Sequence, residues 1–297
     1  MTDGGPSAGG VLRAGARSFP WGGARSPHLM AIVNATPDSF SDGGLHASPE
    51  QAIAFAEACA ADGAAILDVG GESTRPGAAR VPAVEQRART EPVVRALARR
   101  HAVSIDTTRA EVAAAALAAG ACMVNDVSGA TEDPAMLGTV AASDAAIVLM
   151  HRRFAPDQDR WSTDRDDRRP AGDVVREVRD WLGARVEAAV RAGIARDRIA
   201  VDPGFGFGKD VGQNVAMLAS LGEFAALGVP VLAGLSRKSF LGAIAGQPDP
   251  AARDAASIGA ALAAAARGAA ILRVHAVRAH ADALSAWGAS PARSPEK

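Results

Sequence analysis

The sequence has few cysteines and no excess of charge of either sign. Only two of its 297 residues are cysteine, Cys59 and Cys122, and their separation fits no metal-binding or redox motif. We expect both to act as small buried apolar side chains in a reducing, cytoplasmic compartment. The formal net charge of -1 excludes a global field that would recruit nucleic acid or an anionic membrane.

Long apolar runs are also missing, because no uninterrupted stretch approaches the ~18 residues of a membrane span. Residues 1–28 are rich in Gly, Ser, Pro and Arg and lack the apolar segment of a secretory signal. We expect them to form a disordered or weakly ordered extension, with a first hairpin near Trp21, and residues 289–297 to form a flexible tail. Residues 29–288 are then one folded domain of ordinary globular composition.

Standard phosphate-binding loops are missing as well. The stretch VDPGFGFGKD (201–210) looks like one, but Pro203 and Asp210 occupy positions where a Walker A loop needs Gly and Ser or Thr. The dinucleotide fingerprint GxGxxG fails too, because Lys209 stands where its last glycine should be. We therefore expect Lys209 to point to solvent or to a neighbouring carboxylate rather than to phosphate.

Short aliphatic runs are present, and they alternate with longer stretches rich in Ala, Leu, Arg and Glu. Eight runs are predicted strands: LMAIVN (29–34), AAILDVGG (64–71), VSIDT (103–107), CMVNDV (122–127), AAIVLMH (145–151), RIAVDPG (198–204), VLAGLS (231–236) and ILRVH (271–275). Near-continuous Val, Ile and Leu runs are typical of parallel strands covered on both faces. Helices are predicted between them at 50–61, 85–100, 109–119, 174–192 and 254–267, the first after Ser48 as N-cap.

Eight β-then-α units over roughly 260 residues predict an α/β fold, a single-domain (β/α)8 TIM barrel, whose usual size is ~250 residues. The longest gap between predicted elements, residues 154–173, is charged and proline-containing, so we expect a surface excursion or a lid. A doubly wound open sheet is the rival fold. The regular units and the lack of a nucleotide fingerprint disfavour it.

Polar side chains follow nearly every predicted strand, which is where a TIM barrel carries its function. A polar residue at the end of a single strand can simply mark where the strand ends. An Asp within an aliphatic run, however, costs desolvation free energy unless it meets a donor. The whole set therefore indicates a polar ligand site. One group suits the amino-oxo edge of a flat heterocycle: Asp106, Asn125, Asp202 and Lys238. A second group suits an anion such as a phosphate with Mg²⁺: Asn34, Arg75, Arg273 and His275.

At these residues the sequence resembles dihydropteroate synthase, the pterin-binding barrel family of folate synthesis that sulfonamides inhibit. The matching pieces are IVNATPDSFSDGG (32–44), DVGGESTRPGA (68–78), SIDTTRAEVA (104–113), MVNDVSG (123–129), VLMH (148–151), DPGFGFGK (202–209), GLSRKSFLG (234–242) and RVH (273–275). They cover all eight predicted strands in order, so together they are highly specific.

The resemblance implies condensation of 6-hydroxymethyl-7,8-dihydropterin diphosphate with 4-aminobenzoate to give 7,8-dihydropteroate and diphosphate. It implies a homodimer, for which the small-residue helix 254–267 could serve, and Mg²⁺ on Asn34. Its catalytic residues would be Asp106, Lys238 and Arg75.

The other residue roles also come from the resemblance. Pterin would be held by Asp106, Asn125, Asp202 and Lys238, with Met150 and Phe207 near its rings. Thr74, Arg237, Arg273 and His275 would contact substrate or diphosphate. Thr74, Arg75, Pro76 and Ser236 would form the aminobenzoate pocket, under a mobile loop that contains Asp38, Phe40 and Ser41.

The chain departs from the family pattern at Ala276, where Asp is common after RVH, and at Ala35 after the expected metal ligand. Neither replaces a residue assigned above. Two other functions stay open. A pterin-binding paralogue without synthase activity is disfavoured by the intact segments 74–76 and 236–238, and a methyltetrahydrofolate methyltransferase barrel should lack the TPDSFSDGG and GESTRP loops.

Overall fold

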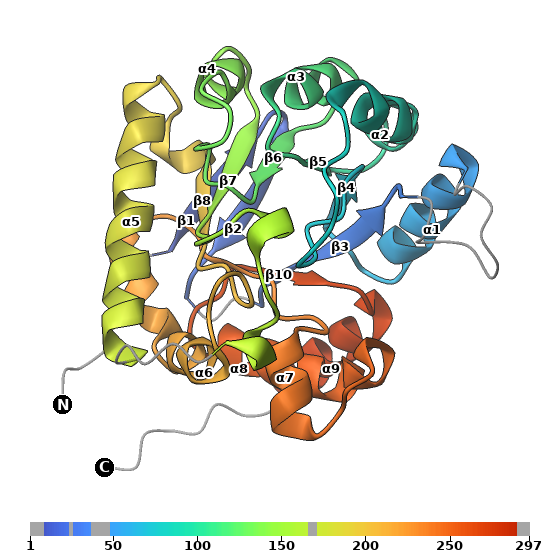
Figure 1. Ribbon diagram of the computed structural model, residues 1–297. Coiled ribbons are helices and arrows are strands. Elements are labelled where there is room, and N and C mark those ends of the chain that lie inside the picture. The colour runs from blue at the N-terminus through green and yellow to red at the C-terminus, as the bar shows by residue number, and fades with distance from the viewer. Residues whose placement is uncertain (1–8, 24–25, 37–47, 166–170, 290–297) are drawn as a thin grey trace.

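The barrel prediction is confirmed. A computed structural model describes residues 9–23, 26–36, 48–165 and 171–289 (Figure 1). All eight predicted runs contribute strands to one parallel sheet in the order β8-β7-β6-β5-β4-β3-β10-β9. The strands are β3 (His28–Asn34), β4 (Ile66–Gly70), β5 (Val103–Asp106), β6 (Met123–Asp126), β7 (Ala146–Met150), β8 (Ile199–Asp202), β9 (Leu232–Ala233) and β10 (Ile271–Val274). A parallel bridge between Val201 and Val231 joins the two ends of this order and closes the barrel.

Helices surround the strands on the outside (Figure 1). They are α1 (Pro49–Ala61), α2 (Ala83–Leu97), α3 (Ala110–Ala118), α4 (Met136–Ala141), α5 (Ala171–Arg191), α6 (Val211–Ala219), α7 (Ser239–Ala245), α8 (Asp254–Ala265) and α9 (Val277–Ala289). Short 3-10 turns lie at Pro156–Gln158, Ser162–Asp164, Arg196–Arg198, Leu221–Leu227 and Pro250–Arg253. All five predicted helices are confirmed. Ser48 is the N-cap of α1, in a reciprocal capping box with Gln51.

Strand residues alternate between the helix layer and the barrel interior. Along β3, Leu29, Ala31 and Val33 pack in the large cluster under the helices. Met30 instead belongs to an apolar cluster inside the barrel, near the amino ends of the strands. By this alternation Asn34 faces inward at the opposite, carboxyl end. The interior is therefore apolar at one end and polar at the other.

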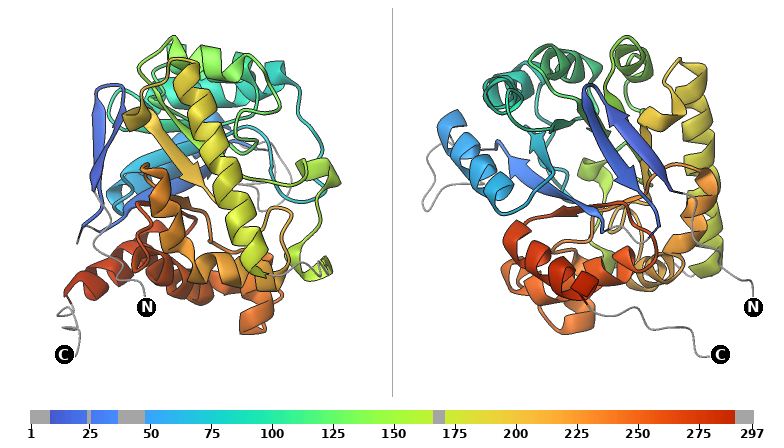
Figure 2. Two further views of the ribbon diagram at one scale, coloured as in Figure 1. Left: turned by 90° about the vertical axis from the view of Figure 1, so that its left-hand side faces the viewer. Right: turned by 180° about the vertical axis from the view of Figure 1, so that it is seen from behind.

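A hairpin of β1 (Gly10–Ala14) and β2 (Arg17–Trp21) covers the apolar end, as the right-hand view of Figure 2 shows. Its Leu12 and Phe19 are 1% and 6% exposed and pack in the interior apolar cluster. The hairpin predicted near Trp21 is confirmed. The prediction that all of residues 1–28 are weakly ordered is wrong for this hairpin, because its apolar side chains fill the end of the barrel.

The cysteines follow their prediction in part. Cys59 is buried under the helices, and burial raises the pKa of its thiol to about 11. Cys122 is only partly buried, and its Sγ donates to the carbonyl oxygen of Val103. Both are free thiols.

Candidate active site

Strand register places the predicted polar residues near the carboxyl ends of the barrel strands. Asn34 lies opposite Gly70 on β4, and Gly70 lies opposite Asp106 on β5. Asp106 in turn lies opposite Asn125 on β6. Across the barrel, Met150 and Asp202 are paired in the same way. The carboxyl ends of the strands therefore bring these side chains to one mouth, as predicted from their positions after the strands.

Arg273 lies between two carboxylates at this mouth. Its Nε donates to Asp68 Oδ2 and its Nη2 donates to Asp106 Oδ2, each across 2.7 Å. Asp68 also accepts from Asn125 Nδ2 at 3.0 Å. The sequence suggested a separate anion-binding group for Arg273. In the structure its guanidinium also joins the pterin-type acceptors and balances part of their charge.

Asp68 was missed as a site residue, although it lies in the quoted DVGG motif. It is 0% exposed inside an aliphatic strand. The signal that could have identified it is the one applied to Asp106 and Asp202, namely an Asp within an apolar run that must find a donor.

Asp68 and Asp106 each have one carboxylate oxygen that can still accept a hydrogen bond. Asp68 Oδ1 and Asp106 Oδ1 are buried and have no hydrogen-bond partner in the described part of the chain. Burial raises the pKa of Asp106 to about 7, against the opposing effect of Arg273. Buried polar atoms are nearly always paired in folded proteins, so these oxygens are suited to N–H donors of a ligand.

Asp202 and Lys238 form the second charged group at the mouth. Burial raises the pKa of Asp202 to about 6 and lowers that of Lys238 to about 8. Lys238 Nζ lies 3.9 Å from the ring centroid of Phe207, a cation–π contact. Phe207, Met150 and Val127 form a small buried apolar cluster. A flat ring therefore meets an apolar wall beside an acceptor and a donor.

The loop after β8 is held in place by hydrogen bonds to buried side chains. Lys209 is 0% exposed, and its Nζ donates to the carbonyl oxygens of Gly204 (2.9 Å), Phe207 (3.0 Å) and His151 (3.4 Å). The prediction that Lys209 points to solvent or to a carboxylate is wrong. Two carbonyls of this loop and the carbonyl of His151 after β7 point to one buried position, and the amine of Lys209 satisfies all three.

The glycines of this loop are required by close approach. A Cβ on Gly204 would lie 1.8 Å from the carbonyl oxygen of His151, and one on Gly206 would lie 2.9 Å from Lys238 Cδ. Both glycines have positive φ, 71° and 80°. Gly208 is bound through its N–H to Asp159 Oδ2 at 3.1 Å. The loop is therefore a rigid wall rather than a phosphate cradle.

Ser236 and His275 lie side by side at the ends of β9 and β10. Ser236 Oγ and His275 Nδ1 are 2.9 Å apart, and the His275 backbone N–H also donates to this hydroxyl. Burial and the nearby cations Arg237 and Arg273 lower the pKa of His275 to about 3. A neutral imidazole suits hydrogen bonding better than general base catalysis, which agrees with the predicted role.

Arg237 points away from the pterin-type residues. Its guanidinium is bidentate on Asp254, with Nε–Oδ1 and Nη2–Oδ2 distances of 2.7 and 2.9 Å. Its φ is 60°, a strained value for a residue with a side chain, and its backbone N–H donates to Ser257 Oγ. These contacts hold the turn that carries Ser236 and Lys238. The structure brings those two neighbours to the mouth but not the Arg237 side chain.

The loop after β4 carries three predicted residues of the aminobenzoate pocket. Thr74 and Pro76 are partly buried, whereas Arg75 is exposed. Thr74 lines a narrow cavity together with Asp106. Asp38, Phe40 and Ser41 lie outside the described residues.

The donor set decides what kind of metal could fit. Among residues 9–23, 26–36, 48–165 and 171–289, no cluster of three His, Cys, Asp or Glu could hold an ion by itself. Asn34 offers one amide oxygen at the mouth. Mg²⁺ commonly uses one or two protein oxygens, with phosphate oxygens and water completing the shell. Asn34 therefore fits a Mg²⁺ ion that binds together with a diphosphate, not a protein-only cage.

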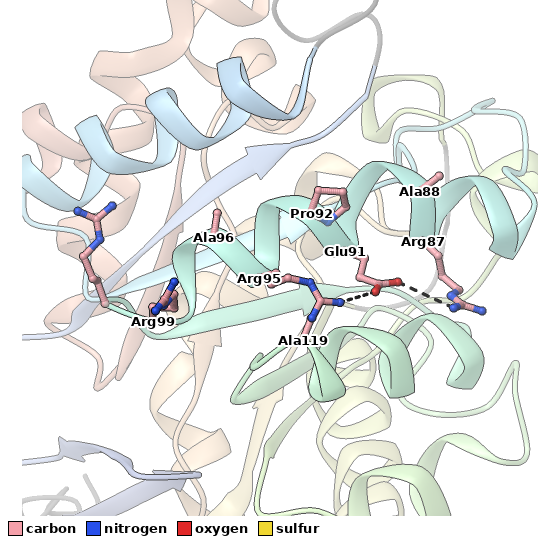
Figure 3. Close-up of a pocket in the computed structure, with 9 residues that line it drawn as sticks. Arg87, Ala88, Glu91, Pro92, Arg95, Ala96, Arg99 and Ala119 are labelled. Atoms are coloured by element: carbon pink, nitrogen blue, oxygen red, sulfur yellow. Dashed lines mark hydrogen bonds and ion pairs between the residues drawn. The ribbon is translucent and has the colours of Figure 1, made fainter.

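Another hollow lies elsewhere, along the outer face of α2 (Figure 3). It has a volume of about 1110 Å³. Glu91 forms ion pairs with Arg87 (3.9 Å) and Arg95 (2.6 Å) along its length. Exposed and mutually paired charges of this kind form a solvated helix face. The barrel mouth, with its buried acceptors, is the better candidate for chemistry.

Comparison with known proteins identifies the family of the chain. Residues 30–275 match the family model described as pterin binding enzyme. Dihydropteroate synthase of Synechocystis sp. is 45% identical over 91% of this chain and 92% of its own length. The Xanthomonas albilineans dihydropteroate synthase with 4-aminobenzoic acid is 44% identical, with a TM-score of 0.84 over 95% of this chain and 100% of that chain. The same enzyme in complex with 7,8-dihydropteroate has a TM-score of 0.81 and is 42% identical, over 95% of this chain and 100% of that chain.

Proposed function

The chain belongs to the dihydropteroate synthase family of pterin-binding enzymes, transferases of folate biosynthesis, and we propose that the barrel mouth described above carries this reaction. 6-Hydroxymethyl-7,8-dihydropterin diphosphate and 4-aminobenzoate are condensed to 7,8-dihydropteroate and diphosphate. The Xanthomonas albilineans enzyme is bound to 7,8-dihydropteroate and to 4-aminobenzoic acid in separate structures, which supports this product and the second substrate.

The buried, unpartnered oxygens of Asp68 and Asp106 are the observation that carries the proposal. The amino and ring N–H groups of a pterin can donate to such oxygens, and Asp202 adds a further acceptor. Asn125 presents both a donor and an acceptor, and Lys238 donates. Neutral apolar ligands are disfavoured at this mouth, because they would leave the carboxylate oxygens unpaired.

The pterin ring stacks against the apolar wall. Met150 and Phe207 offer this surface beside the charged groups, and Lys238 already lies over the face of Phe207. A planar ring inserted here keeps its polar edge on the carboxylates and its faces on apolar atoms, which is how a heterocycle is oriented and shielded from water.

The diphosphate lies toward the outer part of the mouth. His275 and Thr74 are neutral hydrogen-bonding groups there, and Arg273 and Arg75 supply positive charge. Asn34 would hold Mg²⁺ together with the diphosphate. When bound, Mg²⁺ would neutralise charge on the leaving group. Arg237 contributes through the turn that it fixes, because its own charge is engaged by Asp254.

Bond breaking precedes bond making. The C–O bond to diphosphate breaks first, and the pterin methylene becomes electron-poor. The Asp106 carboxylate, in its ionised form, stabilises this developing positive charge. The aminobenzoate nitrogen then donates its lone pair to the methylene carbon and releases one proton to solvent. The amine needs no strong base, which agrees with the neutral His275.

The aminobenzoate pocket is formed by Thr74, Arg75, Pro76 and Ser236. Ser236 is fixed by His275, and the other three lie on the loop after β4. Such a pocket holds the amine in line with the methylene, and positioning of this kind is a major part of catalysis in two-substrate reactions.

Location and assembly are further parts of the proposal. The free thiols Cys59 and Cys122 suit a reducing cytoplasm. In the described part of the chain, no helix is long and apolar enough to cross a membrane. The small-residue helix α8 is the proposed contact of a homodimer, which light scattering coupled to gel filtration can test.

A two-substrate assay tests the function. Purified protein with pterin diphosphate, 4-aminobenzoate and Mg²⁺ is expected to form 7,8-dihydropteroate, and a chelator is expected to reduce the rate strongly. Binding of the pterin without product would instead favour the inactive paralogue. The control is Asp106→Asn, which keeps the shape of the side chain and removes its charge.

A further inference from the structure

The loop between β4 and α2, which carries Thr74, Arg75 and Pro76, is tied to its surroundings by few bonds. Glu72 Oε1 accepts from the Val81 backbone N–H at 2.6 Å, which closes the loop on itself. The Gly77 backbone N–H donates to the carbonyl oxygen of Pro156 at 2.8 Å. The second bond is a link to another loop, the one after β7.

Arg80 adds charged links from this loop to two other loops. Its guanidinium forms an ion pair with Glu132, beyond β6, and lies 4.0 Å from Asp157, beyond β7. It also lies 3.7 Å from Glu72 on its own loop. We call these four residues the Arg80 strap: Arg80, Glu72, Glu132 and Asp157.

Three residues of the Arg80 strap are partly buried, which makes their charges more effective than those of surface pairs, whereas the Asp157 side chain is 45% exposed. The side chains of Arg80, Glu132 and Glu72 are 29%, 24% and 10% exposed. Solvent and salt therefore screen them less than fully exposed partners. Arg152, with a side chain only 6% exposed, pairs with Glu132 from the other side.

The strap adjoins the reacting region. One narrow cavity is lined by strap residues and by site residues, among them Glu72, Arg80, Thr74 and Asp106. A shift of Arg80 would thus be transmitted to the wall that carries Thr74. No strap residue lies among the groups assigned to the pterin.

We propose that Arg80 is a positioning residue for the second substrate: by tying the Thr74–Pro76 segment to the loops after β6 and β7, it holds the aminobenzoate pocket in its binding shape. The proposal rests on the proposed function, because that assignment places aminobenzoate against this segment. Arg80 acts through the loop and touches no reacting atom.

Arg80→Met is the direct test. Arg152 still pairs with Glu132 in this variant, so the fold is expected to persist. The KM for 4-aminobenzoate should rise about tenfold, while kcat and the KM for pterin diphosphate stay within about twofold. Arg80→Lys keeps the charge and should recover part of the loss. Arg87→Met is the matched control, because Arg87 is 42% exposed and pairs with Glu91 and Glu111 on the outer surface.

Hydrogen exchange provides a readout that does not depend on catalysis. The Gly77 amide should exchange faster in Arg80→Met than in the wild type, and exchange of the Gly204 amide on the opposite loop should not change. An unchanged exchange rate of the Gly77 amide would overturn the positioning role of Arg80. An equal rise in the KM of both substrates would also overturn it. Failure of the wild type to form product would instead defeat the proposed function, and the Gly77 measurement would still test the link itself.

Discussion

Arg273 and Asp106 are 167 residues apart in the chain and are joined inside the barrel by an N–H···O bond of 2.7 Å. The same guanidinium binds Asp68, so one cation is shared by two carboxylates. With both carboxylates ionised, the cluster carries one net negative charge. A site of this charge is complementary to a methylene that becomes cationic as diphosphate leaves.

Asp106→Asn should lower kcat steeply, by about 10²–10³-fold, because the amide keeps the shape but cannot stabilise the developing positive charge. The melting temperature should change little, since Asp68 still pairs with Arg273. Steady-state kinetics and calorimetry measure the two quantities. The electrostatic role is refuted if turnover is unchanged while the protein remains folded.

The pH profile of kcat/KM should be bell-shaped. Burial raises the pKa of Asp106 to about 7, so its ionised, active form accumulates as pH rises through that value. Burial lowers the pKa of Lys238 to about 8, so its protonated, donating form is lost above that pH. The rate should therefore rise through pH 7 and fall beyond pH 8.

Lys238→Arg provides the matched test of the alkaline limb. A guanidinium stays protonated throughout the range in which Lys238 titrates. The fall above pH 8 should disappear in this variant even if its maximal rate is lower. An alkaline limb that remains in place would assign that limb to another group.

Lys209→Met should destabilise the protein by about 2–4 kcal/mol, because three buried carbonyls from two neighbouring loops lose their donor. Arg99→Met, an exposed change on the outer surface, should cost less than about 0.5 kcal/mol. Urea unfolding compares the two. Equal stability of both variants would contradict the capping role of Lys209.

Gly204→Ala and Gly77→Ala separate crowding from backbone strain. Both glycines have positive φ, 71° and 78°. A Cβ would meet the His151 carbonyl at 1.8 Å in the first case and nothing within 4 Å in the second. Gly204→Ala should cost about 3 kcal/mol or more, and Gly77→Ala about 1 kcal/mol. Comparable losses would show that strain alone explains the glycine at 204.

Phe19→Ala tests the role of the amino-terminal hairpin. Phe19 is 6% exposed and fills the apolar end of the barrel, so its truncation should cost about 3–5 kcal/mol. Val11 on the same hairpin is 42% exposed, and Val11→Ala should be nearly neutral. Thermal unfolding measures both. If Phe19→Ala left the melting temperature unchanged, the hairpin would be weakly ordered, as predicted from the sequence.

The sequence was enough to predict the eight strands, five of the helices and the polar residues that end the strands. The signals for these features are local. Aliphatic runs and helix caps repeat along the chain, and the carboxyl end of every barrel strand points to the same mouth. That rule was enough to predict Asp106, Asn125, Asp202 and Lys238 as neighbours at one end of the barrel.

The partners of the charged groups were decided by the tertiary structure. The sequence assigned Arg273 to an anion site, and only closure of the barrel showed that its guanidinium also pairs with Asp68 and Asp106. Lys209 was expected at the surface, but in the fold the carbonyls of Gly204, Phe207 and His151 surround its amine. The hairpin was predicted to be weakly ordered, but in the fold Phe19 packs against the apolar end of the barrel. Pairing of a buried charge or an apolar side chain depends on groups that are distant in the chain, and only the packed fold brings them within contact distance.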